Sequence, residues 1–376
     1  MQLTADPARL ERSEQHIADS TLVKIPLLEQ RDSRGGAWAP HLKAKVLGAL
    51  LPTIGLNARA MRHLSRWRTV PRRTGCALDA GSTAAELVRD FKIDIVVLHA
   101  SGGADASEII DVATAAGIPA AIIHHFANGW LGGASVRQQV SRVDAVAGAS
   151  AVAVPRYLRD TFFNLSDGVD TDFYSRDSAH APQREFATPV IYAPGRLTPE
   201  KGQVAVIEVA HRLKQRGLST TVLFAGRAEV PDFESHLRRL AAERGLSDSV
   251  VFLGPLSLEH YRDWYHPATV MLMPTDHSEG MPRTLIESQS MEVPPVVYDI
   301  GGTSEGVRHG ETGYVVKQGD VDRMAGVVET LLRAPDLRRT MGASARRFVV
   351  ESFSLAALAE RHEKFYAHIL EQRRKR

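Results

Sequence analysis

Residues 279–287 read E-G-M-P-R-T-L-I-E and place two carboxylates, Glu279 and Glu287, eight positions apart. The apolar run Val270–Met273 just before them predicts a short buried strand. Pro282 suits the first turn of a helix, because that position needs no backbone N–H donor, and Ser278 is predicted to cap this helix. The stretch therefore predicts a strand, a loop that holds Glu279, and a helix that holds Glu287.

A helix that begins here would offer a binding site for an anion, because its first N–H groups lack partners within the helix. Glu279 would lie beside the anion, and Glu287 would lie roughly 8 Å further along the helix. Two acceptors that flank a phosphate suit a nucleotide-sugar, with one carboxylate for sugar hydroxyls and one for the ribose. Pro282 has no N–H to donate, so the donors are expected to be the amides of Gly280, Met281, Arg283 and Thr284.

A second segment, residues 190–202, reads V-I-Y-A-P-G-R-L-T-P-E-K-G. Val190–Ala193 predicts a strand, and apolar residues at helical spacing after Gly202 predict a helix. Arg196 and Lys201 then share the loop between strand and helix. Arg can bind a diphosphate through two parallel hydrogen bonds and Lys adds a point charge, so this loop is a second predicted anion site.

The two segments together resemble those of the retaining nucleotide-sugar glycosyltransferases of the GT-B fold, family 4. In that family a G-R-L…E-K-G loop and an E-x7-E segment lie about eighty residues apart, as they do here. The resemblance extends from about Asp94 to the end of the chain. Further matching pieces are Leu223–Gly226, Val251–Gly254, Pro295–Val297, Gly301–Glu305 and Gly310–Gly313.

The resemblance implies an α/β protein with two facing Rossmann-like domains, each a doubly wound parallel sheet, and a cleft between them. Short apolar segments alternate with helical patterns from Ile93 onward and favour the same class. The strands predicted in the first half are Ile93–Leu98, Ala120–Ile123, Ala145–Ala147 and Ala151–Val154. Residues 1–178 are expected to bind the acceptor and residues 179–354 the donor. Residues 355–376 are expected to form a helix that packs back across the linker, which is assigned to the polar residues 176–188.

The resemblance also implies roles for individual residues. Arg196, Lys201 and the amides after Glu279 would stabilise the departing diphosphate, while Glu279 would hold sugar hydroxyls and Glu287 the ribose. His125, at the tip of a strand, would orient the sugar and steady positive charge at its anomeric carbon. The base would contact the loops after two strands, at Gly226, Arg227 and Leu256.

The expected reaction moves a sugar from a nucleoside-diphosphate sugar, with UDP favoured, to an acceptor hydroxyl with retention of configuration. The acceptor would be a carbohydrate, a lipid-linked molecule or a small molecule, in glycan, polysaccharide or glycolipid synthesis. No cofactor is expected, since the nucleoside-diphosphate sugar is a substrate. No metal is expected either, since the spacing of the E-x7-E acids is too wide for one shared ion. Two alternatives remain: a catalytically weak partner subunit that binds nucleotide-sugar, and a sugar phosphorylase or epimerase on the same fold.

Each of these residues also has a structural interpretation. Glu279 and Glu287 are common at the start and on the surface of helices, and Arg196 and Lys201 suit a solvated loop. His125 suits a structural role, and the loops with Gly226, Arg227 and Leu256 suit plain connections. Gly301-Gly302 suits either a tight turn or close approach to the donor. Gly35 and Gly36 are weak candidates for a flexible acceptor loop, because residues 1–20 lack the strand with which such a domain normally opens.

Length and composition limit the number of domains, the kinds of partner and the cellular compartment. The 376 residues suffice for two domains, and a net charge of +2 gives no support for nucleic-acid binding. Cys76 is the only cysteine, which fits a reducing compartment, and we expect a cytoplasmic protein because no signal pattern or long apolar run is present. Residues 33–78 contain nine Lys and Arg but no Asp or Glu. They favour peripheral contact with an anionic membrane, a solvated arginine face or a groove for an acidic acceptor.

Overall fold

The structure is a computed structural model that describes residues 94–99, 104–124, 134–152 and 154–374. Two compact units divide the described chain. The first ends at Leu165 and takes in the chain again from Ala359, and the second spans Ser166–Leu358. These limits differ from the predicted boundaries at residues 178 and 354. Several predictions fall outside the described residues: Gly35, Gly36, His125 and the basic stretch 33–78.

The first unit contains a parallel four-stranded sheet in the order β1-β2-β3-β4. Its strands alternate with helices, as the apolar pattern predicted. The strands are β1 Val96–His99, β2 Ala120–His124, β3 Ala145–Gly148 and β4 Phe162–Asn164, and the helices are α5 Ala104–Ala115, α6 Ala134–Val140 and the short 3-10 helix η2 Arg156–Leu158.

The fourth strand differs from the prediction, which placed it at residues 151–154. The hydroxyl of Ser150 accepts a hydrogen bond from the amide of Val152, which turns the chain directly after β3. Ala151 and Val152 are exposed, and Pro155 follows. Because side chain–backbone turns of this kind compete with sheet pairing, the strand forms later, as β4.

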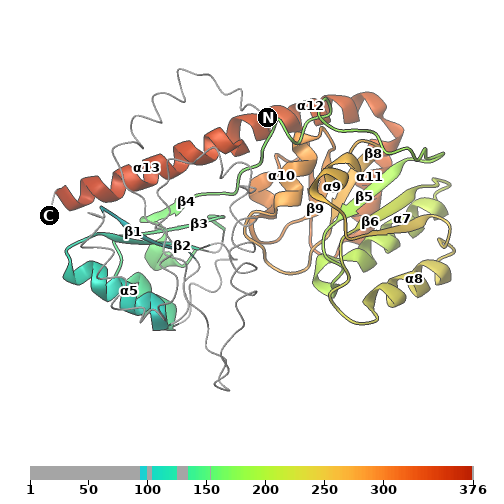
Figure 1. The fold of residues 1–376 in the computed structure, drawn as a ribbon. Coiled ribbons are helices and arrows are strands. Elements are labelled where there is room, and N and C mark those ends of the chain that lie inside the picture. The colour runs from blue at the N-terminus through green and yellow to red at the C-terminus, as the bar shows by residue number, and fades with distance from the viewer. Residues whose placement is uncertain (1–93, 100–103, 125–133, 153, 375–376) are drawn as a thin grey trace, which may run out of the picture. The chain divides into compact units, whose positions relative to one another are not determined.

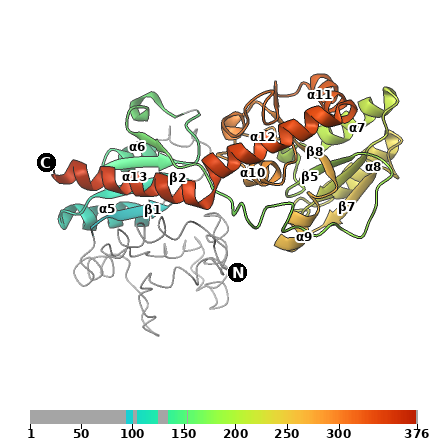
Figure 2. The same ribbon diagram turned by 90° about the horizontal axis from the view of Figure 1, so that it is seen from above.

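The C-terminal helix α13, Leu355–Arg374, lies along the sheet of the first unit (Figures 1 and 2). Phe365 and Ile369 are fully buried against Ala121, Ile123 and residues of β3. The helix predicted within residues 355–376 is therefore present, over Leu355–Arg374.

The second unit contains a parallel six-stranded sheet in the order β10-β9-β8-β5-β6-β7. Side chains alternate between its faces: Ile191 joins the core cluster formed with α7, α8 and α11, whereas Tyr192 contacts Tyr261 and Tyr265 on the other face. The strands are β5 Val190–Pro194, β6 Thr221–Ala225, β7 Val250–Gly254, β8 Ala268–Met273, β9 Pro295–Tyr298 and β10 Tyr314–Val316.

The strand order creates a switch point between β5 and β8. From β5 the chain moves outward to β6 and β7, and it then returns to place β8 on the other side of β5. The loops after these two strands therefore leave the sheet side by side, which is where ligands bind in doubly wound sheets. The helices are η3 Pro199–Lys201, α7 Gln203–Gln215, α8 Phe233–Glu243, α9 Leu258–Asp263, α10 Arg283–Ser290, η4 Gly301–Gly306, α11 Val321–Arg333 and α12 Pro335–Phe353.

Candidate functional site

The loop after β5 is docked onto the loop after β8. The carbonyl of Glu200 accepts hydrogen bonds from the Thr275 hydroxyl at 2.9 Å and from the Asp276 amide at 3.0 Å. Gly202 has φ of 74°, and a Cβ atom there would lie 1.9 Å from the carbonyl oxygen of Pro274. Only glycine permits both this conformation and this approach. The two loops are thus held together by backbone contacts and by the Thr275 hydroxyl.

This docking brings together two of the predicted site residues. The Lys201 Nζ lies 2.7 Å from the Glu279 Oε1, and these side chains are 18% and 17% exposed. The Nε2 of His277 lies 4.0 Å from the same carboxylate oxygen. The backbone of Glu279 is fixed as well, because its carbonyl accepts the amide of Gly302 at 2.9 Å. A cation and an acid therefore face each other at the switch point of the sheet.

A cavity of about 180 Å³ opens at the ends of β5 and β8. Arg196 and Lys201 line it from the first loop, and Thr284 lines it from the first turn of α10. Gln203 also lines it and donates a hydrogen bond from its Nε2 to the Arg196 carbonyl at 2.8 Å. The cavity thus combines two cationic side chains with the start of a helix, a set of groups that suits an anion.

Arg196 is held by an acid that the sequence did not single out. Its Nη1 lies 2.6 Å from the Oε2 of Glu229, and the Nη2 of Arg227 lies 3.1 Å from the other oxygen of that carboxylate. These two arginines hold the pKa of Glu229 below its ordinary value. Arg196 is half exposed, so its side chain can move between Glu229 and the cavity.

The helix α10 begins at Arg283, so Pro282 is its N-cap and Ser278 does not cap it. Pro282 has extended backbone angles, and its carbonyl accepts the first hydrogen bond, from Leu285 at 3.1 Å. Because Pro282 precedes the helix, the loop with Glu279 is longer than predicted. Within the described chain, the amides of Gly280, Met281 and Thr284 donate no hydrogen bond to another residue.

Glu287 lies inside the protein rather than in the cavity. Its side chain is 6% exposed, and its Oε1 lies 3.6 Å from the Arg283 Nη2. Burial raises the pKa of the Glu287 carboxyl, and nearby Arg283 opposes that shift. Burial raises the pKa of Tyr192, and the nearby Glu287 carboxyl raises it further. The Tyr192 hydroxyl donates a hydrogen bond to the Tyr261 carbonyl. The second acid of the E-x7-E segment therefore sits in an apolar and tyrosine-rich environment.

The predicted base-contact residues lie on the loops after β6 and β7, and none of them lines the cavity. Gly226 has φ of 147° and packs against the carbonyl of Gly195, where a Cβ atom would lie 1.9 Å away. Arg227 is largely exposed and bound to Glu229. Leu256 follows β7 and is half-buried. Gly301 supports the Glu279 backbone, because a Cβ atom at Gly301 would lie 2.5 Å from the Glu279 carbonyl oxygen.

Sequence reasoning missed Glu229, His277 and Gln203. Glu229 follows Arg227 by two positions, and His277 precedes Glu279 by two, so closeness to a singled-out residue was the available signal. Gln203 could have been noticed as a polar residue at the start of an otherwise apolar helix face. It is 3% exposed.

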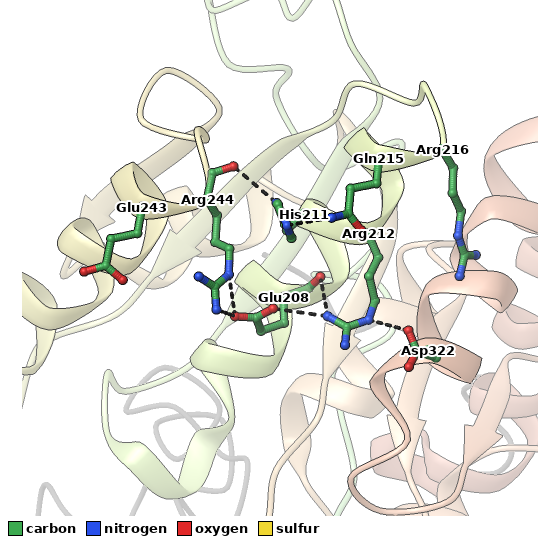
Figure 3. Close-up of a pocket in the computed structure, with 8 residues that line it drawn as sticks. All are labelled: Glu208, His211, Arg212, Gln215, Arg216, Glu243, Arg244 and Asp322. Carbon is green, nitrogen blue, oxygen red and sulfur yellow. Dashed lines mark hydrogen bonds and ion pairs between the residues drawn. The ribbon is translucent and has the colours of Figure 1, made fainter.

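A second hollow of about 480 Å³ lies over the outer face of α7 (Figure 3). The carboxylate of Glu208 sits between two guanidinium groups, with the Arg244 Nη2 at 2.8 Å and the Arg212 Nη1 at 3.1 Å, and Arg212 also binds Asp322. Arg216 binds Glu329 at 3.0 Å. These ion pairs join α7 to α11 and to the end of α8, which gives the charged residues a structural role.

In the described part of the chain, no group of three or more His, Cys, Asp or Glu side chains lies close enough to hold a metal ion. None of the helices formed by these residues combines the length and apolar character needed to cross a bilayer.

The chain is similar in sequence to a family of glycosyl transferases and to individual mannosyltransferases. Residues 176–348 match the family model described as glycosyl transferases group 1. A GDP-mannose-dependent alpha-(1-6)-phosphatidylinositol monomannoside mannosyltransferase of Mycobacterium tuberculosis is 30% identical over 206 residues, covering 52% of this chain and 53% of the relative. A GDP-mannose-dependent monoacylated alpha-(1-6)-phosphatidylinositol monomannoside mannosyltransferase of Corynebacterium glutamicum is 29% identical, covering 74% of this chain and 77% of the relative. The match thus spans about half the length of the first relative.

Solved structures confirm the fold. A glycosyltransferase from Rickettsia africae superposes with a TM-score of 0.68 at 18% identity, covering 84% of this chain and 88% of that one. The Anabaena protein Alr3699/HepE in complex with UDP gives 0.64 at 15% identity, covering 77% and 82%. The chain has the GT-B fold, with its two parallel-sheet α/β units.

Replacing Glu287 with glutamine is expected to stabilise the second unit at neutral pH by about 1 kcal/mol. Burial raises the folded-state pKa of this carboxyl above 4.5. Its ionisation therefore costs stability as the pH rises from about 4.5 through the folded-state pKa, and that cost persists above it. Urea unfolding between pH 4 and pH 8 should show the advantage of Glu287→Gln growing with pH. Glu259→Gln, on the exposed start of α9, serves as the control. An advantage that stays constant with pH, or a less stable variant, would contradict this expectation.

Proposed function

We propose that this chain is a retaining glycosyltransferase that takes a sugar from a nucleoside-diphosphate sugar and transfers it to an acceptor hydroxyl. The observation that carries the proposal is the meeting of Lys201 and Glu279 at the switch point of the second sheet, beside the cavity lined by Arg196. The match of residues 176–348 to the glycosyl transferases group 1 family supports it.

In the proposed complex, the diphosphate lies in the cavity. Lys201, Arg196 and the amides before and at the start of α10 bind its oxygens. These groups stabilise the diphosphate more strongly as the bond between sugar and phosphate breaks, because negative charge then grows on the phosphate oxygens. Glu279 holds hydroxyls of the sugar. The acceptor oxygen attacks the anomeric carbon from the face that the phosphate leaves, and its proton passes to a phosphate oxygen.

The remaining assignments are proposals that rest on the resemblance. Glu287 binds the ribose, which requires its carboxyl to become accessible on donor binding, and His125 orients the sugar. Gly226, Arg227 and Leu256 contact the base. No metal takes part. The acceptor is a carbohydrate, a lipid-linked molecule or a small molecule, and the basic residues 33–78 place the enzyme against an anionic membrane surface on the cytoplasmic side.

Uridine and guanosine are the first candidates for the nucleoside of the donor, with UDP and GDP as the corresponding diphosphates. The Anabaena neighbour was solved with UDP, and the mycobacterial and corynebacterial relatives are named as GDP-mannose-dependent. Thermal unfolding of the full chain with UDP, GDP and ADP distinguishes them. A ligand at about 100 times its Kd adds about 2.7 kcal/mol to the free energy of unfolding, so one base should raise the Tm well above the others.

The sugar nucleotide of the base that binds is then incubated with the enzyme, with and without candidate acceptors. NMR of the first sugar product should show the anomeric configuration of the donor. Inversion would contradict the retaining mechanism, and failure of all three nucleotides to bind would contradict the function itself. Binding without transfer or hydrolysis would favour a partner subunit.

A further inference from the structure

Both cations that the proposed function assigns to the diphosphate already hold carboxylates. The Lys201 Nζ contacts Glu279 at 2.7 Å, and the Arg196 Nη1 contacts Glu229 at 2.6 Å. An incoming diphosphate must compete with these acids for the same N–H donors. The free-energy cost of losing the cation differs between Glu229 and Glu279, because the two acids differ in the other partners and the water that they can reach.

Glu229 has a second partner. Its carboxylate also contacts Arg227, whose side chain is 72% exposed, and Glu229 itself is 28% exposed. When Arg196 turns toward a phosphate, Glu229 keeps one guanidinium and has access to water. Loss of Arg196 from this pair therefore costs little, as is usual for exposed ion pairs.

Glu279 is more restricted. Its side chain is 17% exposed, and its backbone is held by the Gly302 amide and by close packing of Gly301. Its only other basic neighbour in the described structure is His277, 4.0 Å away. When Lys201 turns to a phosphate, Glu279 stays beside that phosphate as a partly buried acid that has lost its cation. Such a juxtaposition of like charges is costly.

We infer that the Lys201–Glu279 pair makes this site select nucleotides that carry a sugar over the sugar-free nucleoside diphosphate. The inference rests on the proposed function. The hydroxyls of a bound sugar donate hydrogen bonds to Glu279 and replace the lysine that the phosphate has taken. A nucleoside diphosphate also binds Lys201, but it has no sugar hydroxyl to donate a hydrogen bond to Glu279. Glu279 thereby lowers the affinity for the nucleoside diphosphate that remains after sugar transfer and promotes its release.

The test compares Glu279→Gln with Glu229→Gln. Each variant removes the charge of one acid and frees one of the two cations that line the cavity, Lys201 or Arg196, so they form a matched pair. Dissociation constants are measured by titration calorimetry for UDP and UDP-glucose, or for GDP and GDP-mannose, whichever pair the wild-type chain binds. The same titrations with His277→Asn present in each protein exclude a replacement of Lys201 by the histidine ring.

Glu279→Gln is expected to bind the nucleoside diphosphate about tenfold more tightly and the sugar nucleotide no more tightly than wild type, because it loses the acceptor for the hydroxyls. Glu229→Gln should change both constants by the same factor. The inference is overturned if Glu279→Gln leaves the affinity for the nucleoside diphosphate unchanged or lowers it, or if Glu229→Gln changes the selectivity equally. Absence of any nucleotide binding to the wild-type chain would instead refute the proposed function.

Discussion

Lys201→Ala is expected to lower kcat/KM for the donor by about 10²–10³-fold with the fold intact. The lysine lies in the loop after β5, lines the cavity and contacts Glu279 at 2.7 Å. Its removal takes away a cation where the leaving diphosphate gains charge. It also leaves Glu279 without its nearest cation, so negative charge beside the phosphate is no longer balanced.

Steady-state rates of donor hydrolysis or transfer measure this loss. Lys214→Ala is the matched control, since Lys214 lies near the end of α7 in the same unit and donates a hydrogen bond to the Gly245 carbonyl, away from the cavity. Lys214→Ala should keep wild-type turnover. If Lys201→Ala turns over donor at the wild-type rate, the diphosphate does not bind where we propose.

Gly202→Ala is expected to destabilise the second unit by about 2–5 kcal/mol and to abolish donor binding. The added Cβ would lie 1.9 Å from the Pro274 oxygen and 2.6 Å from its carbonyl carbon, both of them backbone atoms. Relief of this clash requires the loop after β5 to separate from the loop after β8. That separation moves Lys201 away from Glu279.

Gly217→Ala controls for backbone strain alone. Gly217 has φ of 75°, almost equal to the 74° of Gly202, yet a Cβ atom there would meet nothing within 4 Å. The free energy of unfolding of this variant should fall by roughly 1 kcal/mol, and its affinity for the donor should equal that of the wild type. Chemical unfolding and nucleotide titration of both variants separate the two effects. Equal losses in the two would show that strain, rather than the contact between the loops, accounts for the result.

Much of the local structure of the site could be predicted from short segments. Val190–Pro194 and Ala268–Met273 are apolar runs that end at or just before proline, and both form buried strands near the predicted bounds. The helices after them follow apolar periodicity. Boundaries were less certain: a hydroxyl–backbone turn at Ser150 displaced a strand, and the loop with Glu279 extends to Pro282, one residue before α10 begins.

The amino-acid sequence alone was sufficient to single out Arg196, Lys201 and Glu279 as charged residues that follow buried strands, because strand and helix signals act over a few neighbouring positions. The partners of those charges depend on the fold. Lys201 meets Glu279 across 78 positions only because β8 returns to lie beside β5, and Arg196 meets Glu229 because β6 lies on the other side. Burial of Glu287 likewise follows from the packing of α10 near Tyr192 and Tyr265. Such contacts are set by strand order and side-chain packing, which no short segment encodes.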